Sequence, residues 1–248
     1  MTGLYQVREK MTTRTIIVGD IHGCYDELAA LLDKVGADAD DSIIATGDLI
    51  VKGEGNRRVL DLFMSDARFS AVLGNHDRAI LRYWRAETAK LKPKQELCRR
   101  ELENGGRERY AAYLASLPTM IEAGAHHLVV HAGVRPGVAL SAQSIEDLTE
   151  LRTLGDDRTD REGVPWYEVY DGERMVLFGH WPQAVPRRGR HAIGLDTGCV
   201  YGYHLTAYIL ETGEFMQVKA RRAYDAPRGR VSGGSSSSSW WRRIFTRL

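Results

Sequence analysis

Short apolar runs recur along the chain, and each ends at a glycine or a polar residue. Runs of this kind predict buried strands when they are about four to eight residues long and rich in β-branched or aromatic side chains. The turn at Thr212-Gly213 separates the last two runs and predicts a hairpin. The predicted strands are residues 14–19, 42–47, 69–73, 127–131, 174–178, 191–195, 203–210 and 214–219.

Helical spacing of apolar residues fills the early gaps between these runs. One apolar face consists of Leu28, Leu31, Leu32 and Val35, and Gly36 follows where a helix typically ends. A second face consists of Val59, Leu60, Leu62 and Phe63. A mostly helical stretch runs from about Asp77 to Leu117, with breaks at Pro93 and at Gly105-Gly106. Strands alternate with helices early and crowd together late, which predicts an α/β fold: a layered αββα sandwich of two mixed sheets flanked by helices.

The 248 residues fit one domain with a single substantial core. We predict an N-terminal extension (1–13), the folded domain (14–227), and a flexible Ser-rich linker with a basic aromatic tail (228–248). Residues 219–248 contain eight Lys and Arg against Asp225 alone, so they carry +7 and the remainder −6. The final WWRRIFTRL fits two interpretations, a disordered end or an anchor that contacts a membrane surface or a polyanion.

The composition points to a reducing compartment. The N-terminus lacks the apolar segment of a secretory signal, and no run of 18 or more apolar residues predicts an integral membrane segment. The three cysteines, Cys24, Cys98 and Cys199, are far apart in the sequence and include no CxxC pair, which argues against a disulfide framework and against a thiolate zinc site. We therefore expect a cytoplasmic protein.

Polar side chains follow five of the predicted strands, at the point where each strand ends. Because the carboxyl ends of strands in open α/β sheets converge on one crevice, we expect these side chains to meet there. They offer carboxylate oxygens, an amide oxygen and imidazole nitrogens, the ligands that suit Mn, Fe, Zn, Co or Ni. Each cluster alone has an ordinary explanation as a turn, a cap or a core histidine, but the whole ordered set predicts a metal site. Its members are Asp20 and His22 (GDIHG), Asp48 (GDLIVKG), Asn75, His76 and Asp77 (GNHD), His131 (VVHAG) and His180 (FGH).

The series GDIHG, GDLxxKG, GNHD, HAG, GH and DTGCVYG resembles the calcineurin-like metallophosphoesterases of the phosphoprotein phosphatase superfamily. The resemblance extends from Asp20 to about Tyr208. The LDTGCVYG segment followed by LTA resembles the bacterial branch, which includes symmetrical diadenosine tetraphosphate hydrolases, ApaH-like phosphatases and bacterial serine/threonine phosphatases. Residues 14–227 would then be a metallophosphoesterase domain.

The resemblance implies two divalent metal ions, with Mn expected first and Fe, Zn, Co, Ni or Mg as alternatives. Asp20 and His22 would bind the first ion, and Asp48 would bridge both. Asn75, His131 and His180 would complete the second site.

The same resemblance implies a role for several other side chains. His76 would be the general acid. Lys52 stands where the family often has a phosphate-binding arginine, and Arg152 is our candidate for the second phosphate-binding cation. Asp77 is a candidate for orienting His76. Trp181 is either a packing residue or a platform on which a base stacks.

Val51 departs from the pattern of the protein phosphatases, which carry at that position an aspartate that orients and charges the acid histidine. An alkoxide leaving group needs a strong proton donor, whereas a phosphate leaving group from an anhydride needs less help. Val51 and Lys52 together therefore favour nucleoside polyphosphates or related phosphoanhydrides as substrates. A serine/threonine protein phosphatase acting on a phosphorylated protein is the alternative. An inactive scaffold or binding module is a distant third, since every expected ligand is present.

Overall fold

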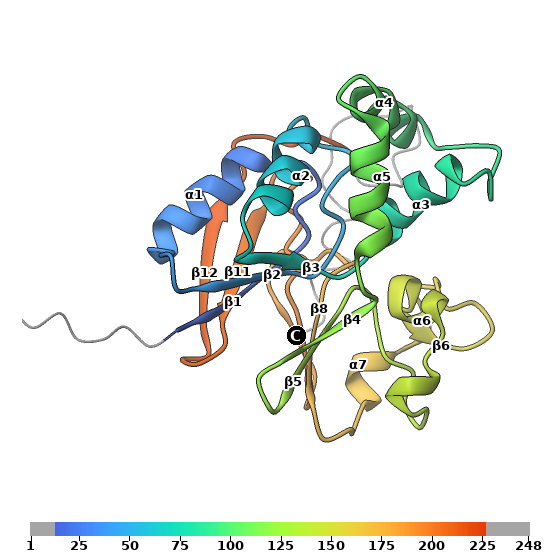
Figure 1. The fold of residues 1–248 in the computed structure, drawn as a ribbon. Coiled ribbons are helices and arrows are strands. Elements are labelled where there is room, and N and C mark those ends of the chain that lie inside the picture. Colours follow the sequence, from blue (N-terminus) through green and yellow to red (C-terminus); the bar gives the residue numbers. More distant parts are fainter. Residues whose placement is uncertain (1–12, 227–248) are drawn as a thin grey trace, which may run out of the picture.

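The computed structural model describes residues 13–226, and these form two five-stranded sheets packed face to face (Figure 1). The first sheet has the order β12 (Glu214–Lys219), β11 (His204–Ile209), β1 (Thr15–Val18), β2 (Ser42–Ala45) and β3 (Phe69–Ala71). The second has the order β4 (Met120–Ala123), β5 (His127–Val130), β8 (Met175–Phe178), β10 (Ala192–Gly194) and β9 (Arg187–Arg188). β6 (Thr153–Leu154) and β7 (Val164–Pro165) form a separate two-stranded ribbon.

Both sheets are mixed, as predicted. In the first, β1, β2 and β3 are parallel, while β11 runs antiparallel to both β1 and β12. In the second, β5, β8 and β10 are parallel, and β4 and β9 add antiparallel edges. The parallel strands of each sheet end on the same side, which is the condition for collecting side chains from several loops at one place.

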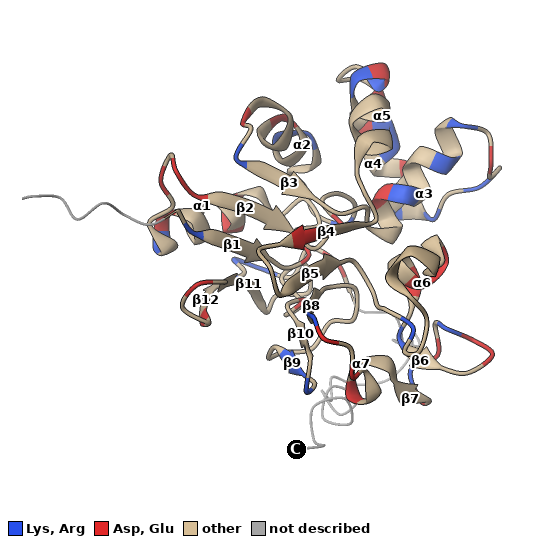
Figure 2. Cartoon of the chain, turned by 60° about the horizontal axis from the view of Figure 1, so that its bottom comes forward, with Lys and Arg blue, Asp and Glu red and all other residues tan. Residues whose placement is uncertain are grey.

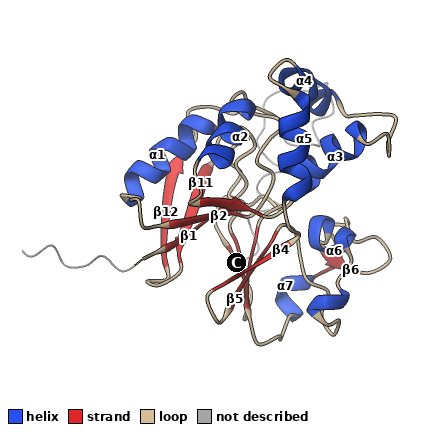
Figure 3. Cartoon of the chain, in the orientation of Figure 1, coloured by secondary structure: helices blue, strands red, loops and turns tan. Residues whose placement is uncertain are grey.

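Helices cover the outer faces of the sandwich (Figure 3). α1 packs against β11 and β12, α2 against β3, and α7 against β10. The helices are α1 (Tyr25–Val35), α2 (Asn56–Ser65), α3 (Asn75–Trp84), α4 (Pro93–Glu103), α5 (Arg107–Ser116), α6 (Ile145–Glu150) and α7 (Trp166–Val169). The αββα architecture predicted from the sequence is confirmed.

The period-two alternation of strand residues explains why the sheets are buried on both faces. In β1, Ile16 and Val18 point into the core beneath α1 to α5, whereas Ile17 points into the core between the sheets. β5 behaves in the same way: Val129 joins the core between the sheets, and Leu128 faces the core beneath α6 and α7. In Figure 2, Lys, Arg, Asp and Glu lie mainly on helices and loops, while β1, β2 and β3 carry none.

The predicted end of α1 and the predicted breaks on either side of α4 agree with the structure. Gly36 ends α1 in the left-handed conformation, at φ 59°. Pro93 opens α4, where its missing N–H costs nothing, and Gly105-Gly106 separates α4 from α5. The sequence did not predict β4, β6, β7, β9, α6 or α7, all of which are six residues or shorter.

The predicted extension, apart from residue 13, and the predicted linker and tail, from residue 228, lie outside the described residues. Between residues 13 and 226, no helix combines the length and the apolar character needed to cross a bilayer.

Candidate metal centre

Five loops bring the sequence-predicted polar side chains together where β1, β2, β3, β5 and β8 end. Three of these residues adopt positive φ values that are uncommon outside glycine: His22 at 49°, Asp48 at 48° and His180 at 66°. Backbone strain of this kind persists only where the surrounding structure enforces it, and it clusters at functional sites. The loops therefore hold their side chains in one arrangement at some cost in stability.

The carboxylate of Asp48 lies between two groups of ligands. Its Oδ2 is 3.5 Å from His22 Nε2, and its Oδ1 is 3.6 Å from His131 Nε2. Asp20, His22 and Asp48 are called the first half-site below, and Asp48, Asn75, His131 and His180 the second. Asp48 is thus able to contribute to both, which is the geometry required of a bridging ligand.

In the second half-site, the amide oxygen of Asn75 lies against imidazole nitrogens of two histidines. The Thr46 carbonyl lies 2.8 Å from His131 Nδ1, which assigns the proton to that nitrogen and leaves Nε2 as an acceptor. Asn75 Oδ1 lies 3.0 Å from His131 Nε2 and 3.0 Å from His180 Nδ1. An amide oxygen facing an unprotonated imidazole nitrogen at this distance is unfavourable unless a cation lies between them, so this group fits a metal ion.

In the first half-site, the Ile50 carbonyl lies 3.2 Å from His22 Nδ1 and assigns the proton there. The acceptor nitrogen Nε2 is then directed towards Asp48, and Asp20 Oδ2 lies 4.0 Å from it. Lys52 donates to the same nitrogen, with Nζ at 2.8 Å. The ammonium group of Lys52 therefore lies against these donor atoms, which favour a positive charge beside them.

Burial sets the protonation of these groups. It lowers the pKa of His22 well below its ordinary value, and it lowers that of His131 to about 4. Both rings are therefore neutral, the form that binds metals. Burial raises the pKa of Asp48 to about 7, and burial together with the charges of Asp196 and Asp48 raises that of Asp20. The charge of Lys52 opposes both shifts without cancelling them, and a bound divalent cation would lower these pKa values further.

Two glycines give the ligands their space. An ideal Cβ at Gly179 would lie 1.8 Å from Asp20 Oδ1, and one at Gly74 would lie 2.3 Å from Asp48 Oδ1. Both distances are far inside van der Waals contact. The glycines of the FGH and GNHD motifs are therefore required for the close approach of carboxylates from neighbouring loops.

His76 lies at the edge of this centre, in edge-to-face contact with His22 at a centroid distance of 5.1 Å. Its Nδ1 is buried and has no hydrogen-bond partner in the described part of the chain. Asp77 does not supply one: its carboxylate accepts from the backbone N–H groups of Leu49, Ile50 and Gly74 at 3.2–3.3 Å. These bonds indicate that Asp77 holds the Asp48 loop against the start of α3 rather than orienting His76.

The two predicted cations both lie near the centre. Lys52 contacts His22, and its Nζ lies 5.3 Å from the ring centroid of Tyr201. Arg152 is largely buried and its Nε has no hydrogen-bond partner among the described residues, although Nη1 donates to the Thr159 carbonyl. Burial lowers the pKa of Arg152 to about 10, while the negative charges of Asp196 and Asp48 oppose the change. Arg152 thus remains cationic within electrostatic range of the centre.

Trp181 is a packing residue by its contacts. It is 8% exposed, it lies edge-to-face with Tyr167, and the guanidinium of Arg187 covers its ring at 4.3 Å from the centroid. A base could stack on the face that Arg187 covers only if Arg187 moved.

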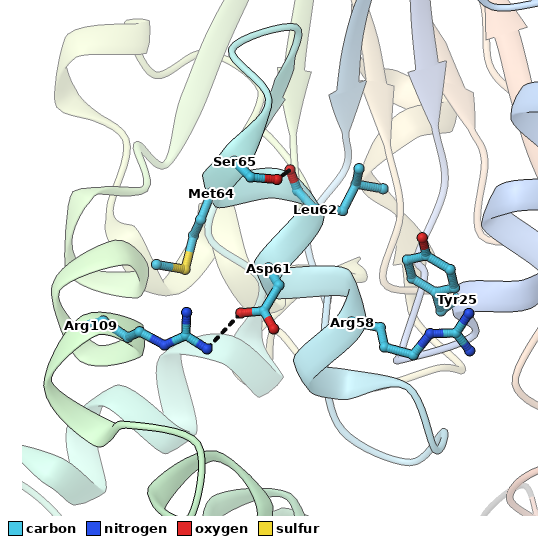
Figure 4. A pocket seen from close by; sticks show the side chains of 7 residues that line it. All are labelled: Tyr25, Arg58, Asp61, Leu62, Met64, Ser65 and Arg109. Carbon is cyan, nitrogen blue, oxygen red and sulfur yellow. Dashed lines mark hydrogen bonds and ion pairs between the residues drawn. The ribbon is translucent and has the colours of Figure 1, made fainter.

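A cavity of about 590 Å³ lies away from these side chains, between α1, α2 and α5 (Figure 4). Arg109 and Asp61 form an ion pair of 2.8 Å across it, and Arg58 lies under the ring of Tyr25. None of the predicted metal ligands lines it. This cavity is therefore not the predicted metal centre, although it is large.

Sequence reasoning missed two residues of the centre. Asp196 is buried, and its charge contributes to the raised pKa of Asp20. Thr46 joins the half-sites, because its hydroxyl donates to Asp20 Oδ1 at 3.1 Å and its carbonyl accepts from His131. A signal was present in both cases: Asp196 belongs to the DTGCVYG segment, and Thr46 precedes the Gly47-Asp48 pair.

Comparisons with known proteins agree with this geometry. The profile of a family described as calcineurin-like phosphoesterase matches residues 13–212. Bis(5'-nucleosyl)-tetraphosphatase PrpE [asymmetrical] of Bacillus subtilis (strain 168) is 27% identical over 240 residues, covering 86% of this chain and 98% of the relative. A symmetrical bis(5'-nucleosyl)-tetraphosphatase of Glaesserella parasuis is 28% identical over 261 residues, covering 77% of this chain and 93% of that protein.

Solved structures also resemble this chain. A crystal structure assigned provisionally as a diadenosine tetraphosphatase superposes with a TM-score of 0.72 at 32% identity, covering 85% of this chain and 95% of that one. A protein serine/threonine phosphatase of Saccharomyces cerevisiae superposes with a TM-score of 0.62 at 16% identity, covering 87% and 82%, and this likeness concerns the fold alone.

Proposed function

Because the chain belongs to the calcineurin-like phosphoesterase family, a family of dinuclear metal-dependent hydrolases, we propose that it hydrolyses nucleoside polyphosphates at the centre around Asp48. The relatives named bis(5'-nucleosyl)-tetraphosphatase cover most of the chain and support this class of substrate. The single observation that carries the proposal is the position of Asp48, with one carboxylate oxygen directed towards His22 and the other towards His131.

The first half-site would hold one divalent ion and the second half-site the other. The donors are carboxylate and amide oxygens and imidazole nitrogens, which suit Mn²⁺ and its first-row neighbours, and we expect Mn²⁺ first. A pair of such ions, when bound, neutralises negative charge on phosphate and lowers the pKa of water towards neutrality.

The side chains beside the half-sites bind phosphate and donate a proton in this proposal. Lys52 and Arg152 bind the phosphate oxygens and offset the charge that develops on them. His76 gives a proton to the departing oxygen. Burial and the charge of Lys52 lower the pKa of His76, so the free site holds it neutral. The negative charge of a bound polyphosphate opposes that effect and raises the pKa again, so that His76 gains its proton only when substrate is present.

The environment of His76 also bears on the leaving group. Its Nδ1 has no hydrogen-bond partner among residues 13–226, and position 51 is a buried valine. Within residues 13–226, no carboxylate bonded to Nδ1 therefore orients His76 and keeps it protonated. This favours phosphoanhydrides, whose leaving group is a stable phosphate, over phosphoserine, whose leaving group is an alkoxide.

A metal-reconstituted activity panel tests the proposal. The purified chain would be loaded in turn with Mn²⁺, Zn²⁺, Co²⁺, Ni²⁺, Fe²⁺ and Mg²⁺ and assayed on diadenosine tetraphosphate, a nucleoside triphosphate, nitrophenyl phosphate and a phosphoserine peptide. We expect the highest kcat/KM on the dinucleoside polyphosphate. Equal or higher kcat/KM on the phosphoserine peptide would replace the proposal with a protein phosphatase, and inactivity with every ion would leave a binding module.

A further inference from the structure

A second group of metal-type ligands consists of residues outside both half-sites. Cys24 precedes α1, Glu27 lies in its first turn, and Cys199 comes from the loop between β10 and β11, 175 positions after Cys24. Each offers one donor atom, and the three atoms lie within 4.8 Å of one another. The residues are 1%, 1% and 2% exposed, respectively. Two thiols and a carboxylate are thus enclosed together in the interior.

The carboxylate of Glu27 is only half satisfied. Its Oε1 accepts from the hydroxyl of Tyr224 at 2.8 Å and from the backbone N–H of Arg221 at 3.0 Å. Its Oε2 is buried and has no hydrogen-bond partner in the described part of the chain. A buried carboxylate oxygen without a partner is costly, and such groups in native proteins are normally paired or bound to an ion.

Two of the three residues also line a cavity. A cavity of about 240 Å³ is lined by Cys24, Glu27 and Tyr224. It shares Tyr25 and Arg58 with the 590 Å³ cavity drawn in Figure 4. A water molecule occupying this space would complete a four-ligand shell.

We propose that Cys24, Cys199 and Glu27 form a third metal site, separate from the centre around Asp48, that binds a thiophilic divalent cation of the zinc class. Zinc–sulfur bonds of about 2.3 Å place two sulfurs about 3.8 Å apart in a tetrahedral shell, within reach of the observed cluster. Binding forms two metal–sulfur bonds and one metal–oxygen bond, and it releases two thiol protons to solvent. No change of oxidation state is involved.

Such an ion would be a structural clip. It would join the turn that follows His22 to the loop that follows Asp196, and through Glu27 to the segment of Arg221 and Tyr224. These three segments come from opposite ends of the sequence. The sequence argued against a thiolate zinc site because the cysteines are far apart and include no CxxC pair, whereas the fold brings Cys24 and Cys199 together.

Cobalt substitution gives a direct test, because the centre around Asp48 contains no sulfur ligand. The full chain, kept reduced with a phosphine, would be titrated with Co²⁺ while the near-ultraviolet thiolate-to-cobalt charge-transfer band is recorded. We expect a saturable band in the wild type, and native mass spectrometry with Zn²⁺ should show three ions per chain. Absence of the band in the wild type overturns the third site, as would formation of a Cys24–Cys199 disulfide without any cobalt–sulfur absorption.

Variants assign the ligands. Cys24→Ser and Cys199→Ser should each lower the band, and the double variant should abolish it. Cys98→Ser is the matched control, since Cys98 is equally buried but lies in α4 outside the cluster, and its band should equal that of the wild type. Glu27→Gln should keep the band but weaken Co²⁺ binding by about tenfold or more.

A band that persists in the double cysteine variant, or unchanged affinity in Glu27→Gln, contradicts the site. Glu27→Gln retains both cysteines and so remains informative if a serine variant fails to fold. Because the readout is absorption by a cobalt–sulfur bond, it is independent of which substrate the enzyme hydrolyses.

Discussion

Asp48 and His131 meet across the two sheets of the sandwich, with Asp48 Oδ1 3.6 Å from His131 Nε2. Asp48 follows β2 of the first sheet, and His131 follows β5 of the second. The contact therefore depends on how the sheets pack as well as on local sequence. It brings the second half-site within reach of the same carboxylate that faces His22.

Replacing Asp48 with asparagine should remove metal from both half-sites together. An amide oxygen is a neutral ligand, and it cannot offset two divalent charges as a carboxylate does. We expect Asp48→Asn to lose both ions by elemental analysis and to lower kcat/KM by at least about a hundredfold. Asp66→Asn, which alters a carboxylate paired with Arg68 away from the centre, is the control and should retain both ions. Loss of only one ion in Asp48→Asn would mean that Asp48 does not bridge.

The same substitution should have opposite effects on stability with and without metal. Burial raises the pKa of Asp48 to about 7 in the folded, metal-free chain, against about 3.9 in an unfolded chain. The folded state thus binds a proton more tightly, so this group's contribution to stability is complete below about pH 3.9 and is lost as pH rises through 7. In a chelator, Asp48→Asn should unfold at higher urea than wild type at pH 8, with the gain vanishing towards pH 4.

With saturating Mn²⁺, the wild type should instead unfold at higher urea than Asp48→Asn at pH 8, because the ionised carboxylate is then paired with metal. Urea midpoints measured at pH 4, 6 and 8, with chelator and with Mn²⁺, give the full comparison. A variant that is less stable than wild type in both conditions at pH 8 would show that Asp48 is not a strained carboxylate in the metal-free protein.

Lys52 should act through its charge. Lys52→Met should lower kcat/KM on diadenosine tetraphosphate by about 10²–10³-fold, the usual effect of removing one donor to a developing anion. It should also raise the pKa of His76, since the charge of Lys52 adds to burial in lowering it. The limb of the pH–rate profile that reports His76 would then move to higher pH. Lys52→Arg keeps the charge and should keep most of the activity; equal losses in both variants would contradict an electrostatic role.

Position 51 should control the preference for the leaving group. Val51 lies at φ 77°, a conformation that is unfavourable for a β-branched residue and easier for aspartate or asparagine. Val51→Asp should raise the ratio of kcat/KM on a phosphoserine peptide to that on diadenosine tetraphosphate by about tenfold or more, because the carboxylate would orient His76 and keep it protonated. Val51→Asn relieves the same backbone strain without the charge and should leave the ratio unchanged. If both variants shift the ratio equally, the carboxylate is not the cause.

The architecture was predictable because its signals are local. Ile16, Ile17 and Val18 alternate between two cores, and the predicted strands 14–19, 42–47, 69–73 and 174–178 each end at or just before a glycine of a site motif. The edge strand β4 was not predicted, because only Ala123 of its four residues is buried and the alternation is weak. The pair β6–β7 has two residues per strand, too few for any period to be visible.

The centre was less predictable where it depends on tertiary contacts. The order of motifs indicated which side chains should gather, and the structure brings together every one of the predicted metal ligands. The hydrogen bonds that join Thr46 to both half-sites link residues 26 and 85 positions apart, which no spacing rule describes. The direction of Asp77 towards backbone N–H groups also follows from the packing of α3 against the Asp48 loop and not from the GNHD motif.

Electron paramagnetic resonance of the Mn²⁺-loaded chain tests the central claim most directly. A carboxylate that bridges two ions holds them close enough for their spins to couple. We expect a spin-coupled spectrum from the wild type at two equivalents of Mn²⁺, and its loss in Asp48→Asn. A wild-type chain that is saturated with Mn²⁺ yet shows only the spectrum of isolated, uncoupled ions would contradict the bridging role of Asp48 and the dinuclear centre built on it.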